Sequence, residues 1–540
     1  MKMKVFLLCA FTLLAIALRV LSTPAFAQAP SLDVVQTESG LVATTRDSTE
    51  VRAFKMIPFA APPIGDLRWK PPQPVVPWQG VRRADYFSPS CMQYAPAVIP
   101  ISLWYEREQA ASEDCLYLNI WTPAKSPDDK LPVMVWIHGG ANVIGSASVP
   151  TYDGAALAKK GVIVVTTNYR LGVFGFLAHP DLTKESGTNN ASGNYGLMDQ
   201  IAALKWVQKN IAAFGGYPNA VTLFGQSAGS LNVSMLTASP LAKGLFHRAI
   251  SGSAAAFVGA SAMLTIVKLP AAEQAGASWA KNNFNATTIA ELRAKSAVDL
   301  ARPMPPMLAV LDGYVVPDYR ENVYANGQQN DVALLTGWVK DEGTVFGPMA
   351  TTVVSYTAAA QARYGKFADQ FLKTYPANTD AEAIAQSFAM TRDALGRGIW
   401  TWARAHDKTG KTKSYVYHWT YEPPWLPGVK FMQMDPATKL GAYHFSELCY
   451  VFQTLSVWKH ARQYTEVDTK LSDTMSSYWT NFVKTGDPNG PGLPTWPVFD
   501  DKAASPVMYL GTQIQPGPLP NKPGLDFMDA FWSAQLPPKQ

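Results

Sequence analysis

Ala220-Val221-Thr222-Leu223-Phe224-Gly225-Gln226-Ser227-Ala228-Gly229 is the stretch that decides the fold. It starts as an apolar run typical of a buried strand, breaks at Gly225 and leads into a helix-like segment from Leu231 to Leu236. A strand, then G-x-S-x-G, then a helix is typical of a tight turn that presents a nucleophilic serine. The two glycines fit because side chains there would clash with the neighbouring strand and helix. We therefore predict that Ser227 is held above the sheet edge at a helix N-terminus, where developing negative charge is stabilised.

Further apolar runs on both sides of this turn predict an α/β fold. Pro132–Ile137 and Gly161–Thr167 read as buried strands, and the spacing of apolar residues predicts a helix over Leu197–Phe214. Continuous apolar strands that alternate with helices indicate a large, mostly parallel sheet covered on both faces. Val332–Gly337 and Ser414–Trp419 add two strands, while residues 260–440 are richer in helix. We expect one catalytic domain over residues 28–540, with helical insertions.

A glycine-rich loop directly after the strand Pro132–Ile137 is a candidate anion site. His138-Gly139-Gly140-Ala141 leaves its backbone N–H groups little covered by side chains. A serine nucleophile needs such donors for the oxyanion, and they usually come from an earlier strand loop and from the residue after the serine. We predict that Gly140, Ala141 and Ala228 supply them. His138 is interpreted as shaping the loop, with contact to substrate as the alternative.

The first 27 residues have the features of a secretory signal peptide. Lys2 and Lys4 precede an apolar run, and Ala25-Phe26-Ala27 fits a cleavage site after Ala27. The run is short for a membrane span of about 20 residues, so an N-terminal anchor is the weaker alternative. No later stretch is apolar enough to cross a bilayer. We expect a secreted or periplasmic protein without a stable membrane span.

The net charge excludes one class of partner. The whole chain is formally +5, and Lys2, Lys4 and Arg19 leave with the signal, so the mature chain carries +5 − 3 = +2. A nearly neutral chain without basic runs does not predict a nucleic-acid partner. Of the four cysteines, Cys9 lies in the signal, and Cys91 and Cys115 are a plausible disulfide in an exported protein. Cys449 has apolar neighbours and is expected to be a buried free thiol.

Several other blocks of sequence accompany the serine motif. They are Ile57–Ala60, Ser112–Ile120, Asn168–Gly172, Gly193–Gln200, Tyr478–Phe482 and Gly486–Asn489. Together with Phe224–Gly229 they resemble the type B carboxylesterases, the family of carboxylesterases, cholinesterases and bacterial para-nitrobenzyl esterases. The resemblance implies an α/β-hydrolase fold. It also matches Cys91–Cys115 to the family's first disulfide, and implies the ion pairs Arg68–Glu113 and Arg170–Asp199.

The resemblance also assigns two partners to Ser227. Lys340-Asp341-Glu342-Gly343 resembles the family's acid block, and Gly441-Ala442-Tyr443-His444 resembles its histidine block. The order Ser227, Glu342, His444 is the one expected for an α/β-hydrolase. From the residues alone, Asp341 competes with Glu342 as the acid. The family usually has glutamate where this chain has Gln226, and an aromatic residue where it has Asn142. Gln226, Asn142 and His138 are therefore our candidates for substrate contact.

The predicted activity is hydrolysis of a small or medium carboxylic ester through an acyl-enzyme. This chemistry needs no metal and no organic cofactor, and its partner is a small-molecule ester. A lipase, an amidase and an esterase for bulky aryl or feruloyl esters are alternatives on the same fold. A non-catalytic adhesion protein is a remote one, because Ser227, Glu342 and His444 are all present. The oligomeric state and the physiological substrate stay open.

Overall fold

The computed structural model describes residues 32–45, 50–93, 110–257, 266–303, 309–429, 440–502 and 506–535. The predicted signal segment 1–27 and its cleavage site lie outside the described residues. A ten-stranded sheet forms the centre, in the order β17-β16-β15-β14-β11-β10-β8-β9-β7-β3. Its strands are β3 (Arg52–Pro58), β7 (Tyr117–Thr122), β8 (Leu131–Ile137), β9 (Ile163–Thr167), β10 (Gly216–Gln226), β11 (Arg248–Gly252), β14 (Ala333–Val339), β15 (Ser414–Trp419), β16 (Val507–Leu510) and β17 (Ile514–Gly517).

The sheet is mostly parallel, as predicted. From β9 through β8, β10, β11, β14 and β15 to β16, every neighbouring pair runs parallel. The antiparallel pairs lie toward the two edges, where β17 pairs with β16, and β7 pairs with β9 and β3. The predicted strand positions are confirmed, although β10 begins earlier than the sequence indicated. The fold is that of an α/β-hydrolase.

Successive side chains of each strand point to opposite faces of the sheet, and helices cover both faces. On β8, Val133 and Val135 belong to one core cluster, whereas Met134 and Trp136 belong to the other. The first cluster packs under α5 (Tyr195–Asn210) and α6 (Ala228–Ala238), and the second under α14 (Leu448–Val451) and α15 (Glu466–Thr485). This double cover explains why the strands read as continuous apolar runs rather than alternating ones.

The remaining elements surround this core. The smaller sheets contain β1 (Leu32–Thr37), β2 (Gly40–Thr45) and β4 (Val81–Arg83); β5 (Ser90–Cys91) and β6 (Ala111–Ser112); and β12 (Val267–Lys268) and β13 (Val310–Leu311). The other helices are α2 (Ala155–Lys159), α3 (Gly172–Phe176), α4 (Pro180–Glu185), α7 (Leu269–Phe284), α8 (Ile289–Arg293), α9 (Ala297–Ala301), α10 (Arg320–Ala325), α11 (Val353–Tyr364), α12 (Ala368–Thr374), α13 (Asp380–Thr409) and α16 (Lys522–Ser533). No helix among the described residues is both long and apolar enough to cross a membrane.

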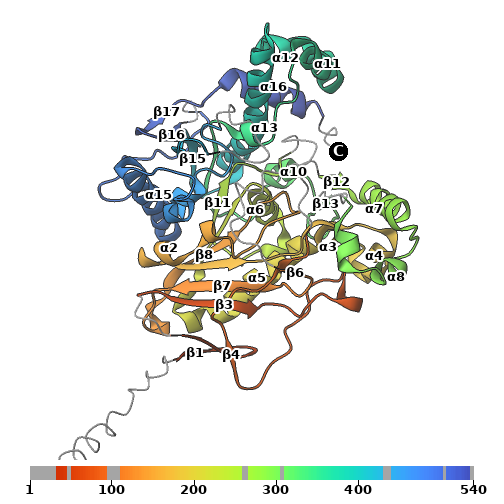
Figure 1. Ribbon diagram of the computed structural model, residues 1–540, viewed down its shortest axis with the longest axis vertical. Coiled ribbons are helices and arrows are strands. Elements are labelled where there is room, and N and C mark those ends of the chain that lie inside the picture. Colours follow the sequence, from red (N-terminus) through yellow and green to blue (C-terminus); the bar gives the residue numbers. More distant parts are fainter. Residues whose placement is uncertain are drawn as a thin grey trace, which may run out of the picture.

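The helical insertion forms a small core of its own. Aromatic side chains of α11, α12 and α16 pack together with α13, among them Tyr364, Phe371, Phe527 and Phe531. Figure 1 shows α11, α12 and α16 gathered at one end of the molecule, with β1 and β4 at the opposite end. The long helix α13 belongs both to this cluster and to the core of the sheet, and so connects the two.

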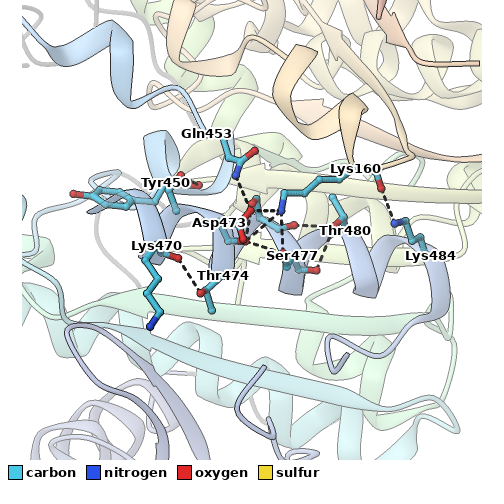
Figure 2. A network of polar contacts seen from close by, with 11 residues as sticks. Lys160, Tyr450, Gln453, Lys470, Asp473, Thr474, Ser477, Thr480 and Lys484 are labelled. Atoms are coloured by element: carbon cyan, nitrogen blue, oxygen red, sulfur yellow. Dashed lines mark hydrogen bonds and ion pairs between the residues drawn. The ribbon is translucent and has the colours of Figure 1, made fainter. Parts of the chain in front are cut away.

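A polar network attaches α15 to the segment before β9 (Figure 2). Lys160 Nζ donates to Asp473 Oδ1 at 2.6 Å and to Ser477 Oγ at 2.9 Å. Gln453 Nε2 reaches the same Asp473 oxygen at 3.3 Å, and Lys484 Nζ donates to the backbone oxygen of Lys160 at 2.6 Å. Asp473 is largely exposed. We call Lys160, Gln453, Asp473, Ser477 and Lys484 the α15 surface network.

Candidate active site

The carboxyl ends of the central strands meet at one edge of the sheet. In the register of β8, β10 and β11, Ile137 lies beside Gly225 and Gly252 lies beside Gln226. The loop after β8 therefore starts next to the turn that carries Ser227. Ligands of open α/β sheets bind at this edge, so the sheet itself brings the sequence-predicted residues together.

Ser227 stands on a strained turn. Its backbone has φ 57° and ψ −126°, a conformation that is costly for a residue with a side chain. A Cβ atom placed on Gly225 would lie 2.4 Å from the backbone oxygen of Gly229, and one on Gly229 would lie 2.1 Å from that of Ile137. Both glycines are thus required by close backbone approach. The turn is fixed by Ser227 N–H, which donates to Gly252 O at 2.8 Å, and Ser227 is partly exposed while its neighbours are buried.

The loop after β8 and the start of α6 carry three backbone N–H groups without an acceptor among the described residues. Gly140, Ala141 and Ala228 have no hydrogen-bond acceptor on their N–H groups within the part of the chain that the structure describes. The contact of Gly229 with the end of β8 brings the first turn of α6 against the start of this loop. The loop closes on itself, since Val143 and Ile144 both donate to Gly140 O.

The acid and histidine loops are held together by backbone pairing. Asp341 and Tyr443 form a parallel bridge, and Asp341 Oδ2 accepts from Ala442 N–H at 2.8 Å. The next residue, Glu342, is fully buried and its Oε2 contacts His444 Nδ1. Its other oxygen accepts from Val339 N–H at 3.0 Å. Of the two competing acids, Glu342 therefore meets the imidazole, and Asp341 supports the histidine loop.

Gln226 lies directly against the histidine. Its Nε2 is 3.3 Å from His444 Nε2, the ring nitrogen opposite to the one that meets Glu342. Its Oε1 is buried without a hydrogen-bond partner in the described part of the chain. The ring of Phe346, which is about half exposed, packs against the His444 ring with centroids 5.0 Å apart. His444 is therefore enclosed, with Ser227 as the more accessible member of the group.

The structure buries the side chains of His138 and Asn142. His138 is buried, its Nδ1 lies 2.8 Å from Gly139 O, and its ring stacks on Tyr169. Burial lowers the pKa of His138 to about 4, so the ring is neutral near neutral pH. Asn142 is also buried, and both polar atoms of its amide bond to Asn232. Neither side chain is open to solvent.

Glu447 is a residue that the sequence did not single out. It follows His444 by three positions, is buried, and neither carboxyl oxygen has a partner among the described residues. Burial, and then the nearby charge of Glu342, raise the pKa of Glu447 to about 8. A Cβ atom on Gly252 would lie 3.5 Å from both Glu447 Oε1 and Gln226 Cγ, so this carboxyl lies behind the serine turn. The only hint in sequence was its proximity to His444.

The predicted structural pairs are formed. Cys91 and Cys115 are joined by a disulfide, and Cys449 is a buried free thiol. Burial raises the pKa of Cys449 to about 12, which keeps it protonated and unreactive. Arg68 binds Glu113 through two nitrogens at 2.6 Å each. Arg170 binds Asp199 in the same bidentate manner, at 2.8 and 2.7 Å.

No group of three or more His, Cys, Asp or Glu side chains within the described ranges is arranged to hold a metal ion. The residues at this edge of the sheet are instead suited to nucleophilic chemistry. They are a serine on a strained turn, an imidazole in contact with a carboxyl group, and backbone N–H groups without an acceptor in the described part of the chain.

Comparisons with known proteins identify the family of this chain. The model of the carboxylesterase family matches residues 31–526. The chain is 38% identical to the fumonisin B1 esterase of Sphingopyxis macrogoltabida over 501 residues, which covers 90% of this chain and 87% of that protein. It is 36% identical to carboxylesterase 1D of Mus musculus over 511 residues, covering 86% of each.

The fold has close counterparts among solved structures. A structure of a PNB esterase superposes with a TM-score of 0.78 at 32% identity, covering 92% of this chain and 99% of the other. Fold, site and sequence define a carboxylic ester hydrolase. This chain belongs to the carboxylesterase family.

Proposed function

We propose that Ser227, His444 and Glu342 form the catalytic triad of this ester hydrolase, and that the reaction passes through an acyl-enzyme on Ser227. The observation that carries the proposal is the contact between Glu342 and His444 Nδ1 at the same sheet edge as the strained serine turn. An acid that holds one imidazole nitrogen leaves the other to act on the serine.

The first half-reaction acylates the serine. His444 Nε2 takes the hydroxyl proton as Ser227 Oγ attacks the ester carbonyl, and the N–H groups of Gly140, Ala141 and Ala228 hold the oxyanion. The alcohol leaves with the proton from His444. In the second half-reaction, water gives a proton to His444 and attacks the acyl carbonyl, which releases the acid and restores Ser227. Ser227 Oγ has no hydrogen-bond partner among the described residues, so it must turn toward Nε2 when substrate binds.

Gln226 must release Nε2 of His444 before this proton transfer. A glutamine amide carries a donor and an acceptor and presents either one by rotation. A Gln226 N–H at 3.3 Å that donates to Nε2 of the neutral ring uses the lone pair that the Ser227 hydroxyl needs, so the amide must turn away as the serine turns toward the ring. Asn142 and His138 are proposed to shape the oxyanion loop rather than to touch substrate, since both are buried.

The test compares Ser227→Ala with Ser477→Ala on a panel of esters that varies acyl length and alcohol size. Ser477 belongs to the α15 surface network, where its hydroxyl bonds to Lys160 and to the backbone of Asp473. We expect Ser227→Ala to lose at least about 10⁴-fold in kcat/KM, and Ser477→Ala to match the wild type. A fluorophosphonate probe should add its mass to the wild type and to Ser477→Ala only. Equal turnover by Ser227→Ala and the wild type would reject the serine mechanism.

The same panel addresses the substrate. We propose a small or medium carboxylic ester, and the panel includes fumonisin B1 because one relative is named for its hydrolysis. Interfacial activation on triglyceride emulsions would indicate a lipase, and faster turnover of aryl than of short alkyl esters would indicate an esterase for bulky aromatic substrates.

We also propose that residues 1–27 direct export and are removed, leaving a single catalytic domain over residues 28–540. The Cys91–Cys115 disulfide supports this, because disulfides persist in oxidising compartments. The N-terminal sequence of the exported protein tests it: Gln28 as first residue agrees with cleavage after Ala27, and an intact N-terminus in the membrane fraction contradicts it.

A further inference from the structure

The oxyanion loop contains two consecutive residues in a left-handed backbone conformation. Ala141 has φ 55° and Asn142 has φ 58°. This region is costly for an ordinary L-residue, and asparagine tolerates it better than alanine does. A loop that must place Ala141 in this conformation needs contacts elsewhere that hold it there.

Asn142 provides such contacts to the helix that follows the nucleophile. Asn232 Nδ2 donates to Asn142 Oδ1 at 2.9 Å, and Asn142 Nδ2 donates back to Asn232 Oδ1 at 3.3 Å. Both amides are buried. Asn232 lies on α6, five positions after Ser227. The reciprocal pair therefore joins the loop that carries Gly140 and Ala141 to the helix that begins at Ala228.

A tyrosine fixes the same loop from a third element. The hydroxyl of Tyr169, which follows β9, lies 2.8 Å from His138 O and 3.2 Å from Asn142 Oδ1, and donates its hydrogen to this pair of acceptors. Burial raises the pKa of Tyr169, so the hydroxyl keeps its proton. Gly172 N–H also donates to Asn142 O at 2.7 Å. Asn142 is thus bonded through its side chain and its backbone oxygen.

We propose that Asn142, Asn232 and Tyr169 form a clamp that sets the N–H groups of Gly140 and Ala141 in position relative to Ala228. This inference rests on the proposed oxyanion function of those three N–H groups. The clamp residues are positioning residues, because they act through the backbone donors and do not touch the reacting atoms.

The clamp should affect the transition state more than the ground state. Oxyanion donors are effective because they are fixed before charge develops, and a displacement of about 1 Å can cost about 100-fold in rate. The ester carbonyl of the bound substrate carries much less charge than the tetrahedral intermediate. Loosening the donors should therefore lower kcat and leave KM nearly unchanged.

The experiment uses the full-length enzyme with Asn232→Ala and Asn142→Gly. Asn232→Ala removes the partner amide, and Asn142→Gly removes the loop amide while keeping a residue that adopts positive φ without strain. Tyr169→Phe is a milder third variant that keeps the ring stacked on His138. Asn194→Ala is the matched control. Asn194 is also a buried amide, and it donates at 2.7 Å to Val310 O, which is not part of the oxyanion loop.

The readouts are kcat, KM and the affinities of two matched inhibitors. An aryl trifluoromethyl ketone forms a tetrahedral adduct with the serine, whereas the corresponding methyl ketone binds as a ground-state analogue. We expect the clamp variants to lose about 10- to 100-fold in kcat and a similar factor in affinity for the trifluoromethyl ketone. Affinity for the methyl ketone should stay within about threefold of the wild type. Asn142→Gly combined with Asn232→Ala should lose no more than the more impaired of the two single variants, since both substitutions break the Asn142–Asn232 pair.

Two other outcomes reject different proposals. If kcat and trifluoromethyl ketone affinity stay within about twofold of the wild type in all three clamp variants while Ser227→Ala is inactive, the clamp is wrong and the triad stands. If Asn194→Ala shows the same selective loss as the clamp variants, loss of a buried amide explains it and the clamp is also wrong. If Ser227→Ala remains active, the proposed function fails instead.

Discussion

Two ion pairs of this protein have nearly the same length and very different surroundings. Arg170 and Asp199, next to Tyr169 of the clamp, meet at 2.7 Å with side chains that are 3% and 0% exposed. Lys160 and Asp473, in the α15 surface network, meet at 2.6 Å with side chains that are 21% and 66% exposed. Distance does not distinguish the two pairs, whereas burial does.

The difference in burial decides how much each ion pair contributes to stability. Breaking a buried pair leaves an uncompensated charge in a medium that solvates it poorly. Water replaces a lost partner at the surface, so an exposed pair contributes little. We therefore expect the buried ion pair to be sensitive to the loss of a partner, and the α15 surface network to tolerate such a loss.

After Ser227→Ala, Glu342→Gln should have the largest effect on kcat, because it changes a fully buried contact. A glutamine cannot stabilise the charged imidazole through Nδ1–H as a carboxylate does, so we expect kcat to fall by about 10³- to 10⁴-fold. Steady-state kinetics measure the loss. Asp341→Asn, next in the chain, is the control. Its kcat should stay close to that of the wild type, because the side-chain oxygen of an asparagine can still accept from Ala442 N–H. Equal kcat losses for both variants would contradict the assignment of the acid.

Asp199→Ala is the next largest effect, on stability rather than chemistry. It removes the acceptor of the Arg170 side chain and of the Arg170 backbone N–H. We expect the free energy of unfolding to fall by about 3–5 kcal/mol. Urea unfolding followed by circular dichroism measures it, and a change below about 1 kcal/mol would mean that burial does not separate the two pairs as argued.

Glu447→Gln tests how the stability of the protein depends on pH. The pKa of Glu447 is raised from 4.5 to about 8, so the native carboxyl keeps a proton that the unfolded chain has lost. Its contribution to stability is fully present below pH 4.5 and is lost as the pH rises through about 8. The glutamine variant cannot ionise, so its urea midpoint should fall less than that of the wild type between pH 5 and pH 9. Parallel curves would contradict the raised pKa.

Gln226→Glu tests a smaller, local change at the same edge. A carboxylate at this position would lie beside His444 Nε2, where Gln226 now stands at 3.3 Å. It would favour the charged imidazole, which cannot accept the proton of Ser227. We expect the acid limb of the kcat/KM profile to move to higher pH, by about one pH unit or less. An acid limb that does not move would show that the charge is not felt by the histidine.

Asp473→Ala should have the smallest effect. Lys160 keeps Ser477 as a partner, and the lost pair is largely exposed. We expect a loss of less than about 1 kcal/mol in the free energy of unfolding, and a further decrease in that loss at high salt. A loss near that of Asp199→Ala would contradict the small contribution expected of an exposed ion pair.

Much of this architecture could be predicted from local sequence patterns. Buried parallel strands such as β8 and β9 are continuous apolar runs, and the glycines around Ser227 mark a turn that admits no side chain. The family blocks named Glu342 and His444. What could not be predicted depends on contacts between distant segments. Nothing near Asn142 in the sequence indicates Asn232. Without the family blocks, the residues alone leave Asp341 and Glu342 as competing acids, and only the pairing of Asp341 with the loop at Ala442 separates them.

The order of the strands has a consequence for how the chain folds. One edge of the sheet is β3, near the start of the described chain, and the other is β17, near its end, while the strands between them pair mostly in parallel. Parallel partners cannot form as local hairpins, because each needs a crossover segment. Folding must therefore wait for contacts between distant parts of the chain, which is slow and leaves strand edges unpaired meanwhile. We expect refolding from urea to be slow, with a yield that falls as protein concentration rises.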